Sequence, residues 1–274
     1  MARLRLVTVV AALCLVMGAA GASPLFGIHS YQEWQEALGG GGGGRIVPVP
    51  AQEFRDMVMG TGPYEGLELA EGDGWPDAYK PAEFREPTLE PIRQFDGEAG
   101  LYMTWGADGA EERQAAAWDY VYDEDPDLNG TMIEFSIFPP VESTYVSLNL
   151  IDGSGNYREW IWHAGDPGEL PPGVWSTLVI DPVTGASNWP TAGGSPFIYQ
   201  DPSNPFDLSS IQILRFNENI FATPGFPPGP GGNVPDGWVW NMWNHVEVTP
   251  EPTTMVLVGS GLLGLVLRRR RRKS

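Results

Sequence analysis

The chain is poor in cysteine: Cys14 is the only one among 274 residues. A single cysteine cannot build a disulfide framework, and it cannot supply a cysteine-based zinc site. Small disulfide-stapled scaffolds and cysteine-ligated zinc folds are therefore excluded.

Basic residues are also scarce, with 16 Lys and Arg against 35 Asp and Glu and a net charge of −19. Half of the basic residues lie at the two ends of the chain, at Arg3, Arg5 and positions 268–273. The segment 24–250 has 8 basic and 34 acidic residues, which gives it a charge of −26. This balance excludes nucleic acid as a partner, because a phosphate backbone is bound largely by Lys and Arg.

The N-terminus has the pattern of a leader peptide, and we predict that it is not part of the fold. Two arginines precede an apolar run over residues 6–20, and the small residues Ala20-Gly21-Ala22 follow it. This order is typical of a secretory signal peptide, and the run is shorter than the ~20 residues of a membrane span. We predict a signal peptide over residues 1–22, removed by signal peptidase. Cys14 lies inside the apolar run, so the mature protein is predicted to have no cysteine.

The C-terminus carries a second apolar segment. Pro250-Glu251-Pro252 is followed by an apolar stretch containing three glycines and then by the arginine cluster Arg268, Arg269, Arg270, Arg271 and Arg272. We predict a short transmembrane helix over 253–267, with the arginines as the membrane stop that stays cytoplasmic. The segment is short for a permanent span and suits transient anchoring in the inner membrane.

This order of motif, apolar helix and arginine cluster at a chain end resembles the PEP-CTERM sorting domain of Gram-negative bacteria. The resemblance covers residues 250–274. It implies an exported precursor anchored in the inner membrane, processed by an exosortase at Pro250, Glu251 and Pro252, and released to the cell surface or extracellular matrix. It implies nothing about the activity of the rest of the chain.

Residues 23–94 are predicted to be a loop-rich N-terminal segment. Ser30 and Glu33 have the spacing of a capping box, and Tyr31, Trp34, Ala37 and Leu38 share a helical face, which predicts a short helix over 31–38. Six consecutive glycines at 39–44 then interrupt the pattern. The Pro-, Gly- and acid-rich stretch 48–91 predicts loops with a few short strands.

From residue 95 the pattern becomes one of strands. Apolar residues alternate with polar ones in runs that turn residues separate, as in Ile133, Phe135 and Ile137. The runs are 101–105, 118–122, 132–137, 144–150, 157–163, 174–180, 211–217 and 237–248. We predict a mostly β fold, an antiparallel two-sheet β-sandwich of jelly-roll type, over residues 95–249.

The middle of this region also resembles the jelly rolls of carbohydrate-binding modules. The resemblance rests on Trp160, Trp162, the run 174–178 and the closing strand 245–248. Such domains often have an Asp in that strand where this chain has Asn244. No binding residue is carried over from the resemblance.

No catalytic residues are predicted. His29, His163 and His245 are too far apart in sequence for a local metal motif, and we expect them to be hydrogen-bonded or solvent-facing. No Gly-x-Ser-x-Gly elbow suited to a serine hydrolase is present. With 34 acidic residues in the segment 24–250, no carboxylate pair stands out.

One acidic turn is a candidate calcium site. Asp123, Asp125, Asp127 and Asn129 alternate and are followed by Gly130, which offers the oxygen ligands that Ca²⁺ requires. The alternative is a solvated acidic turn. Asp152, Ser154 and Asn156 form a poorer version of the same pattern. No cofactor is required by the sequence beyond a possible structural Ca²⁺.

The tryptophans have two interpretations, since they can fill the sandwich core or form a platform on which sugar rings stack. Core packing is favoured for those that alternate with polar residues. Trp189, on a predicted loop, is the candidate for ligand contact.

The sequence therefore predicts an exported, acidic protein, delivered by its sorting tail. The favoured function is a non-catalytic structural or carbohydrate-contacting component of the exopolysaccharide layer or biofilm matrix. The alternative is a secreted hydrolase that acts on polysaccharide.

Overall fold

The computed structural model describes residues 26–59, 68–70, 83–84, 92–95, 98–106, 113–142, 144–165, 168–191, 197–200, 205–221 and 238–250. The predicted signal peptide and the predicted membrane segment lie outside these residues, and both stay predictions. Within the residues that are described, no helix is both long and apolar enough to cross a membrane.

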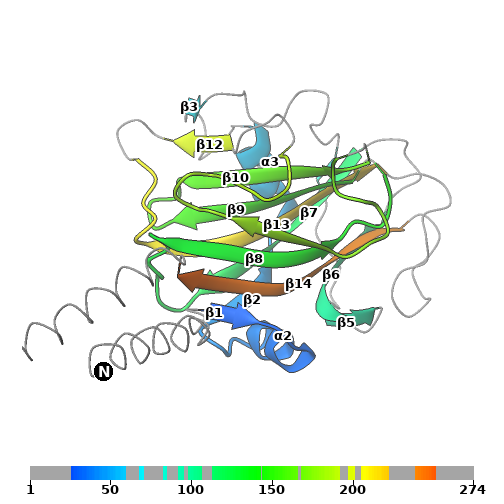
Figure 1. The fold of residues 1–274 in the computed structure, drawn as a ribbon, viewed down its shortest axis with the longest axis horizontal. Helices are drawn as coiled ribbons and strands as arrows, with labels where there is room; N and C mark the ends of the chain where they lie inside the picture. Colours follow the sequence, from blue (N-terminus) through cyan, green and yellow to red (C-terminus); the bar gives the residue numbers. More distant parts are fainter. Residues whose placement is uncertain are drawn as a thin grey trace, which may run out of the picture.

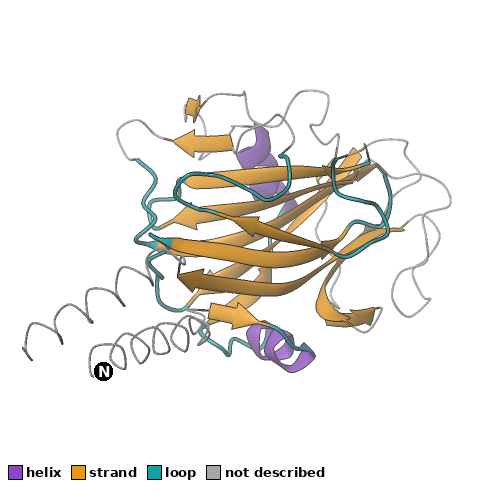
Figure 2. Cartoon of the chain, in the orientation of Figure 1, coloured by secondary structure: helices purple, strands orange, loops and turns teal. Residues whose placement is uncertain are grey.

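The fold is a sandwich of two β-sheets (Figures 1 and 2). The small sheet has six strands in the order β11-β8-β14-β6-β5, with β1 also paired to β14. Its strands are β1 (Phe26–Ile28), β5 (Ile92–Phe95), β6 (Glu98–Gly106), β8 (Thr131–Phe138), β11 (Ser176–Ile180) and β14 (Trp238–Pro250). Every strand pairing described in this sheet is antiparallel.

The large sheet has eight strands in the order β2-β7-β13-β9-β10-β12-β3, with β4 also paired to β7. Its strands are β2 (Gly44–Pro48), β3 (Glu68–Ala70), β4 (Glu83–Phe84), β7 (Arg113–Tyr122), β9 (Thr144–Asp152), β10 (Tyr157–Ala164), β12 (Phe197–Gln200) and β13 (Ile211–Phe221). Its pairings are antiparallel except for that of β4 with β7. The chain crosses repeatedly between the two sheets, which is typical of a jelly roll.

The core lies between the sheets and is rich in aromatic rings. Phe135 and Trp243 of the small sheet meet Trp162 and Phe216 of the large sheet, with ring centroids 5.1–5.4 Å apart. These rings are almost fully buried, and edge-to-face or offset contacts at this distance are favourable. Trp118 and Trp160 join the same cluster, so the predicted core role holds for these tryptophans.

The predicted fold class is confirmed. The eight predicted runs form β6 to β11, β13 and β14. In β8 the burial alternates as the sequence requires, because Ile133, Phe135 and Ile137 point into the core. In β9 every residue is buried, so both faces of that strand are covered.

The N-terminal segment contributes to both sheets. β1 pairs with β14 and β2 pairs with β7. Between them lies the predicted helix, α2 (Tyr31–Leu38), whose Trp34 and Ala37 enter the core, whereas Tyr31 and Leu38 are exposed. A second helix, α3 (Ala51–Met59), follows β2. The predicted division at residues 94 and 95 falls within β5 and stays a prediction.

Candidate functional site: the polar face of the large sheet

The face of the large sheet that points away from the core carries hydrogen-bonding side chains. We call them the polar face: Asp119 on β7, Arg215 and Asn217 on β13, Ser147 and Asn149 on β9, and Glu159 on β10. Asp119 lies opposite Arg215, Arg215 opposite Asn149, and Asn149 opposite Glu159. Residues directly opposite across neighbouring strands share a face, so these side chains form a row across the sheet. Their neighbours along each strand point into the core.

An ion pair anchors one end of the row. The guanidinium of Arg215 donates from Nε to Asp119 Oδ1 at 2.7 Å and from Nη2 to Asp119 Oδ2 at 2.9 Å. Nη2 also donates to Glu53 Oε1 of α3 at 2.7 Å, which fixes this helix against the outer face. Burial disfavours the charge on Arg215, but Asp119 and Glu53 outweigh it and raise its pKa.

The middle of the polar face is an amide cluster. Asn217 Nδ2 donates to Ser147 Oγ at 2.8 Å, to Asn149 Oδ1 and, at 3.5 Å, to Glu159 Oε1. The remaining amide atoms, Asn149 Nδ2 and Asn217 Oδ1, are buried and have no hydrogen-bond partner in the described structure. A buried polar atom without a partner costs about 1–3 kcal/mol, so such atoms call for a functional explanation.

Beyond the amide cluster, the same side of β9 and β10 carries two aromatic rings, the buried Tyr145 and His163, whose side chain is 17% exposed. His163 lies opposite Tyr145, and their ring centroids are 4.3 Å apart. His163 Nδ1 lies 2.5 Å from Glu169 Oε2, and the side chain of Glu169 is 31% exposed. This confirms the expectation that His163 is hydrogen-bonded.

The two carboxylates of the polar face are hydrogen-bonded to neighbouring side chains. Asp119 and Glu159 are separated by β13 and β9. Asp119 is bound to Arg215, and Glu159 Oε1 accepts from Asn217 at 3.5 Å. Glu53 is nearer to Asp119, but both bind the guanidinium of Arg215. The carboxylates of this face thus all have hydrogen-bond partners within the described structure.

The predicted calcium residues lie on an exposed turn between β7 and β8. Asp127 Oδ1 accepts from the backbone N–H and the side-chain amide of Asn129 at 2.9 and 2.8 Å. Asp125 Oδ2 accepts from Gln212 at 3.4 Å. In the described part of the chain, the ligand atoms of Asp123, Asp125 and Asp127 do not converge as a metal-binding group. The calcium hypothesis stays a prediction.

The poorer candidate, at residues 152–156, is a closed turn. Asp152 Oδ1 accepts from the backbone N–H groups of Ser154 and Asn156, both at 2.9 Å. Asp152 Oδ2 accepts from the backbone N–H of Asp207 at 2.9 Å. The carboxylate thus holds the loop between β9 and β10 against the loop that precedes β13.

Trp189 is half-buried and packs against the core. Its indole N–H donates to the carbonyl of Thr177 at 3.0 Å. This contact gives it a packing role, and its predicted contact with a ligand stays a prediction.

Of the sorting motif, Pro250 is the last residue of β14, opposite Thr131 of β8. Glu251, Pro252 and the arginine cluster lie outside the described residues. The motif therefore begins where the closing strand ends, directly on the folded domain.

Sequence reasoning did not find the polar face. The available signal was the polar half of each alternating strand, such as Ser147 and Asn149 in β9 or Arg215 and Asn217 in β13. That half is ordinarily solvent-facing in an antiparallel sheet, so the pattern alone gave no reason to select these residues.

Comparison with known proteins adds one specific match. The model of the PEP-CTERM protein-sorting motif matches residues 248–272. No curated protein matches the chain significantly.

Solved structures with some similarity include family 11 carbohydrate-binding modules. One, from a cellulosomal cellulase of Clostridium thermocellum, is 11% identical with a TM-score of 0.38, over 84% of this chain and 95% of the module. Another from Clostridium thermocellum, in complex with a β-1,3-1,4-mixed-linked tetrasaccharide, is 13% identical with a TM-score of 0.35, over 68% of this chain and 85% of the module. An exo-β-agarase is 12% identical with a TM-score of 0.36, and the match covers 59% of this chain but 22% of the agarase.

With TM-scores below 0.5, these likenesses carry no argument about function. The sorting motif does carry such an argument, because its model matches residues 248–272 of this chain directly. The chain carries a PEP-CTERM sorting motif at residues 248–272, which marks it as an exported protein.

Proposed function

We propose that this protein is a non-catalytic, carbohydrate-contacting component of the extracellular polymer layer. In this proposal, signal peptidase removes the leader, the C-terminal segment anchors the precursor transiently in the inner membrane, and an exosortase releases the domain to the cell surface or matrix.

The observation that carries the proposed contact is the polar face. A sheet face that served only to pack against a covering segment would be apolar, because burying polar groups is costly. This face instead holds six hydrogen-bonding side chains, of which Asn149 and Asn217 each keep one amide atom without a partner. Both amide atoms are buried, so a polymer would contact the partly exposed His163 and Glu169 beside them, whose imidazole and carboxylate can hydrogen-bond to sugar hydroxyl groups. The imidazole ring of His163, which packs on the buried Tyr145, also suits contact with a sugar ring.

Binding to the exopolysaccharide of the producing bacterium tests the proposal. The full chain is purified in detergent and titrated with this polymer by calorimetry, with and without Ca²⁺. The variants Glu169→Ala and His163→Ala should each weaken binding at least ten-fold, because these are the partly exposed side chains. Asn129→Ala is the matched control, because Asn129 is exposed on the acidic turn. It should bind as the wild type does, and thermal unfolding checks that each variant is folded.

Absence of binding both with and without Ca²⁺ would disprove the proposal. Equal binding by folded Glu169→Ala and His163→Ala would move the contact away from this part of the large sheet. Release of reducing ends during the titration would favour the alternative, a polysaccharide hydrolase.

A further inference from the structure

Two histidines that are far apart in sequence meet on the small sheet. His29 follows β1, and His245 lies in β14, 216 positions later. Their Nδ1 atoms are 3.1 Å apart, and their ring centroids are 4.7 Å apart. Both are accessible, since His29 is exposed and the side chain of His245 is 37% exposed.

Strand register brings them together. β1 runs antiparallel to β14 with Gly27 opposite Glu247 and Ile28 opposite Val246. Continuing this register by one residue places His29 opposite His245. Ile28 and Val246 are buried, so the histidines and Glu247 point to the outer face, as period-two alternation requires.

A bulge in β14 aims His245. Asn244 lies opposite Ser136 and Glu247 opposite Glu134, so three steps along β14 match two along β8. His245 has a φ of +51°, the sole positive φ of a non-glycine residue in the described chain. A backbone conformation of this kind costs free energy, and bulges that redirect a side chain are common near functional sites.

His29 is also held from both sides. Its backbone N–H donates to Glu33 Oε2 at 2.7 Å, which ties it to the capping box of α2. Gly27, two positions earlier on the same face, leaves room for the imidazole, because a Cβ at Gly27 would overlap the ring.

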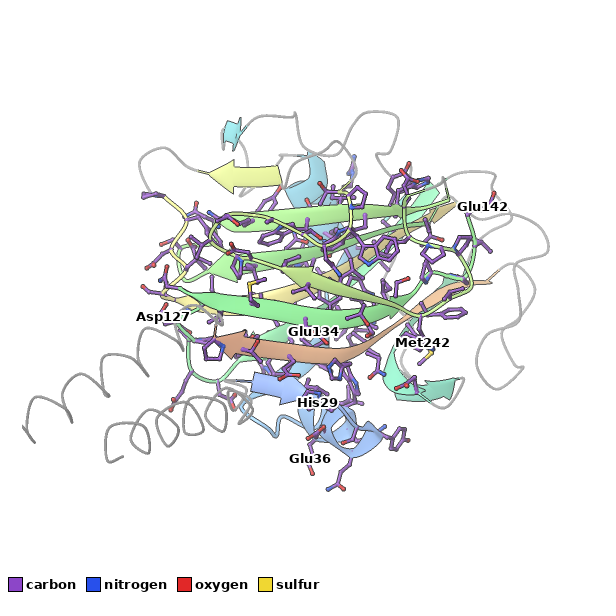
Figure 3. All side chains as sticks on the ribbon, viewed as in Figure 1. His29, Glu36, Asp127, Glu134, Glu142 and Met242 are labelled. Atoms are coloured by element: carbon purple, nitrogen blue, oxygen red, sulfur yellow. The ribbon has the colours of Figure 1, made fainter. Side chains whose placement is uncertain are left out.

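Two carboxylates complete the cluster. One ligand atom each of His29, His245 and Glu247 lies within 4.8 Å of the other two. His245 Nε2 lies 3.6 Å from Glu247 Oε2 and 3.4 Å from Glu134 Oε1. In Figure 3, His29 lies at the end of β1, beside α2, and Glu134 lies on β8, with β14 between them.

We propose that His29, His245 and Glu247 bind a divalent transition metal ion of the zinc class. Zinc takes imidazole nitrogen at about 2.0–2.1 Å and carboxylate oxygen at about 2.0–2.2 Å in tetrahedral sites. Two nitrogens bound in this geometry lie about 3.3 Å apart, close to the observed 3.1 Å between the Nδ1 atoms. When His245 binds through Nδ1, its Nε2–H points to Glu134, the outer carboxylate partner that metal-bound histidines usually have.

The nature of the ligands selects the metal. Ca²⁺ takes six to eight oxygen ligands, and this cluster offers two nitrogens among three ligands, so calcium is a poor fit. The fourth position of a tetrahedral ion faces solvent, which leaves a path for entry. A bound ion would link the first strand to the last and so oppose separation of β1 from β14.

Zinc titration of the chelator-treated full chain in detergent tests this site, with a chromogenic chelator as competitor. The wild type should bind one Zn²⁺ per chain. His29→Ala and His245→Asn should each weaken binding at least ten-fold, and Asn tolerates the positive φ at position 245. His163→Ala is the matched control and should leave zinc affinity unchanged. Zn²⁺ should raise the unfolding temperature of the wild type and of His163→Ala, but not of the other two variants.

Zinc affinity that is unchanged in folded His29→Ala and His245→Asn would overturn the proposal, as would less than one ion per chain. Either result would leave the two rings as a hydrogen-bonded surface pair. Displacement of zinc by excess Ca²⁺ would also contradict it, because calcium would then be the preferred ion.

Discussion

A bidentate ion pair joins two buried charges on the outer side of the large sheet. Arg215 is 1% exposed and Asp119 is 6% exposed, and the two share a pair of parallel hydrogen bonds. Removing Asp119 leaves the Arg215 charge buried with only the partly exposed Glu53 to compensate it, and this penalty exceeds the value of the pair itself. We expect Asp119→Ala to lower the free energy of unfolding by about 3–5 kcal/mol in urea denaturation.

Glu53→Ala is the matched control, because Glu53 binds the same guanidinium from a side chain that is 46% exposed. Solvent screens this contact, so the loss should be about 1 kcal/mol or less. Equal losses in the two variants would show that burial does not set the value of these contacts.

At the residue scale, sequence reasoning found the residues whose role depends on near neighbours. Ser30 and Glu33 form the predicted capping box, and Trp118, Trp160 and Trp243 fill the core. It missed the pair of His29 and His245, because their meeting depends on the register of two strands at opposite ends of the chain. No local pattern encodes a contact across 216 positions.

Among the elements, α2 has an N-terminus whose stability depends on pH. The Glu33 backbone N–H donates to Ser30 Oγ at 3.2 Å, and Ser30 Oγ donates to Glu33 Oε2 at 3.0 Å. The N–H of His29 lowers the pKa of Glu33 below its ordinary value of 4.5, and the Ser30 hydroxyl contributes, against the opposing effect of burial. A lowered pKa means that the ionised form stabilises the fold, and this stabilisation is lost as pH falls through that pKa.

Glu33→Gln separates the charge from the cap. Gln can also serve in a capping box, but it loses the favourable interaction of a carboxylate with the helix N-terminus, about 0.3–1 kcal/mol. We expect the variant to be less stable than the wild type at pH 7 and the difference to vanish as pH falls below 4.5. Denaturation of both proteins from pH 7 to pH 3 measures this difference. A gap that stays constant with pH would contradict the assignment.

The strands differ in how well the sequence predicts them. β8 to β10 have long alternating runs with clear turns, and their positions agree with prediction. β1 and β4, with three and two residues, are too short to show a period and exist because a partner strand pairs with them. The helix α3 was missed as well. Its Glu53 binds Arg215 on the outer face of the large sheet, and its Phe54 is fully buried. These contacts form only when the sheet has folded, so the local sequence does not reveal them.

At the scale of the whole molecule, the first described strand and the sorting motif lie together. β1 pairs with β14 through Phe26 opposite Val248, and β14 continues to Pro250, where it pairs with β8. The matched motif begins at residue 248, so its first residues belong to the closing strand. The segment that an exosortase would process therefore follows directly on β14, and no linker separates this strand from the motif.

This geometry limits where a cut can leave the fold intact. Val248 is fully buried and contacts strands on both sides, so a cut before it would remove core surface and its pairing with Phe26 of β1 and Ile133 of β8. We therefore expect the released protein to end at or after Pro250, with the whole of β14 retained. Intact-mass measurement of the protein recovered from the cell surface or medium gives this end directly. A mature chain that ends before Val248 would show that β14 is dispensable for the released fold.

The variant Glu251→Ala tests exosortase processing itself. It should accumulate in the membrane as unprocessed precursor, and its normal release would refute exosortase processing.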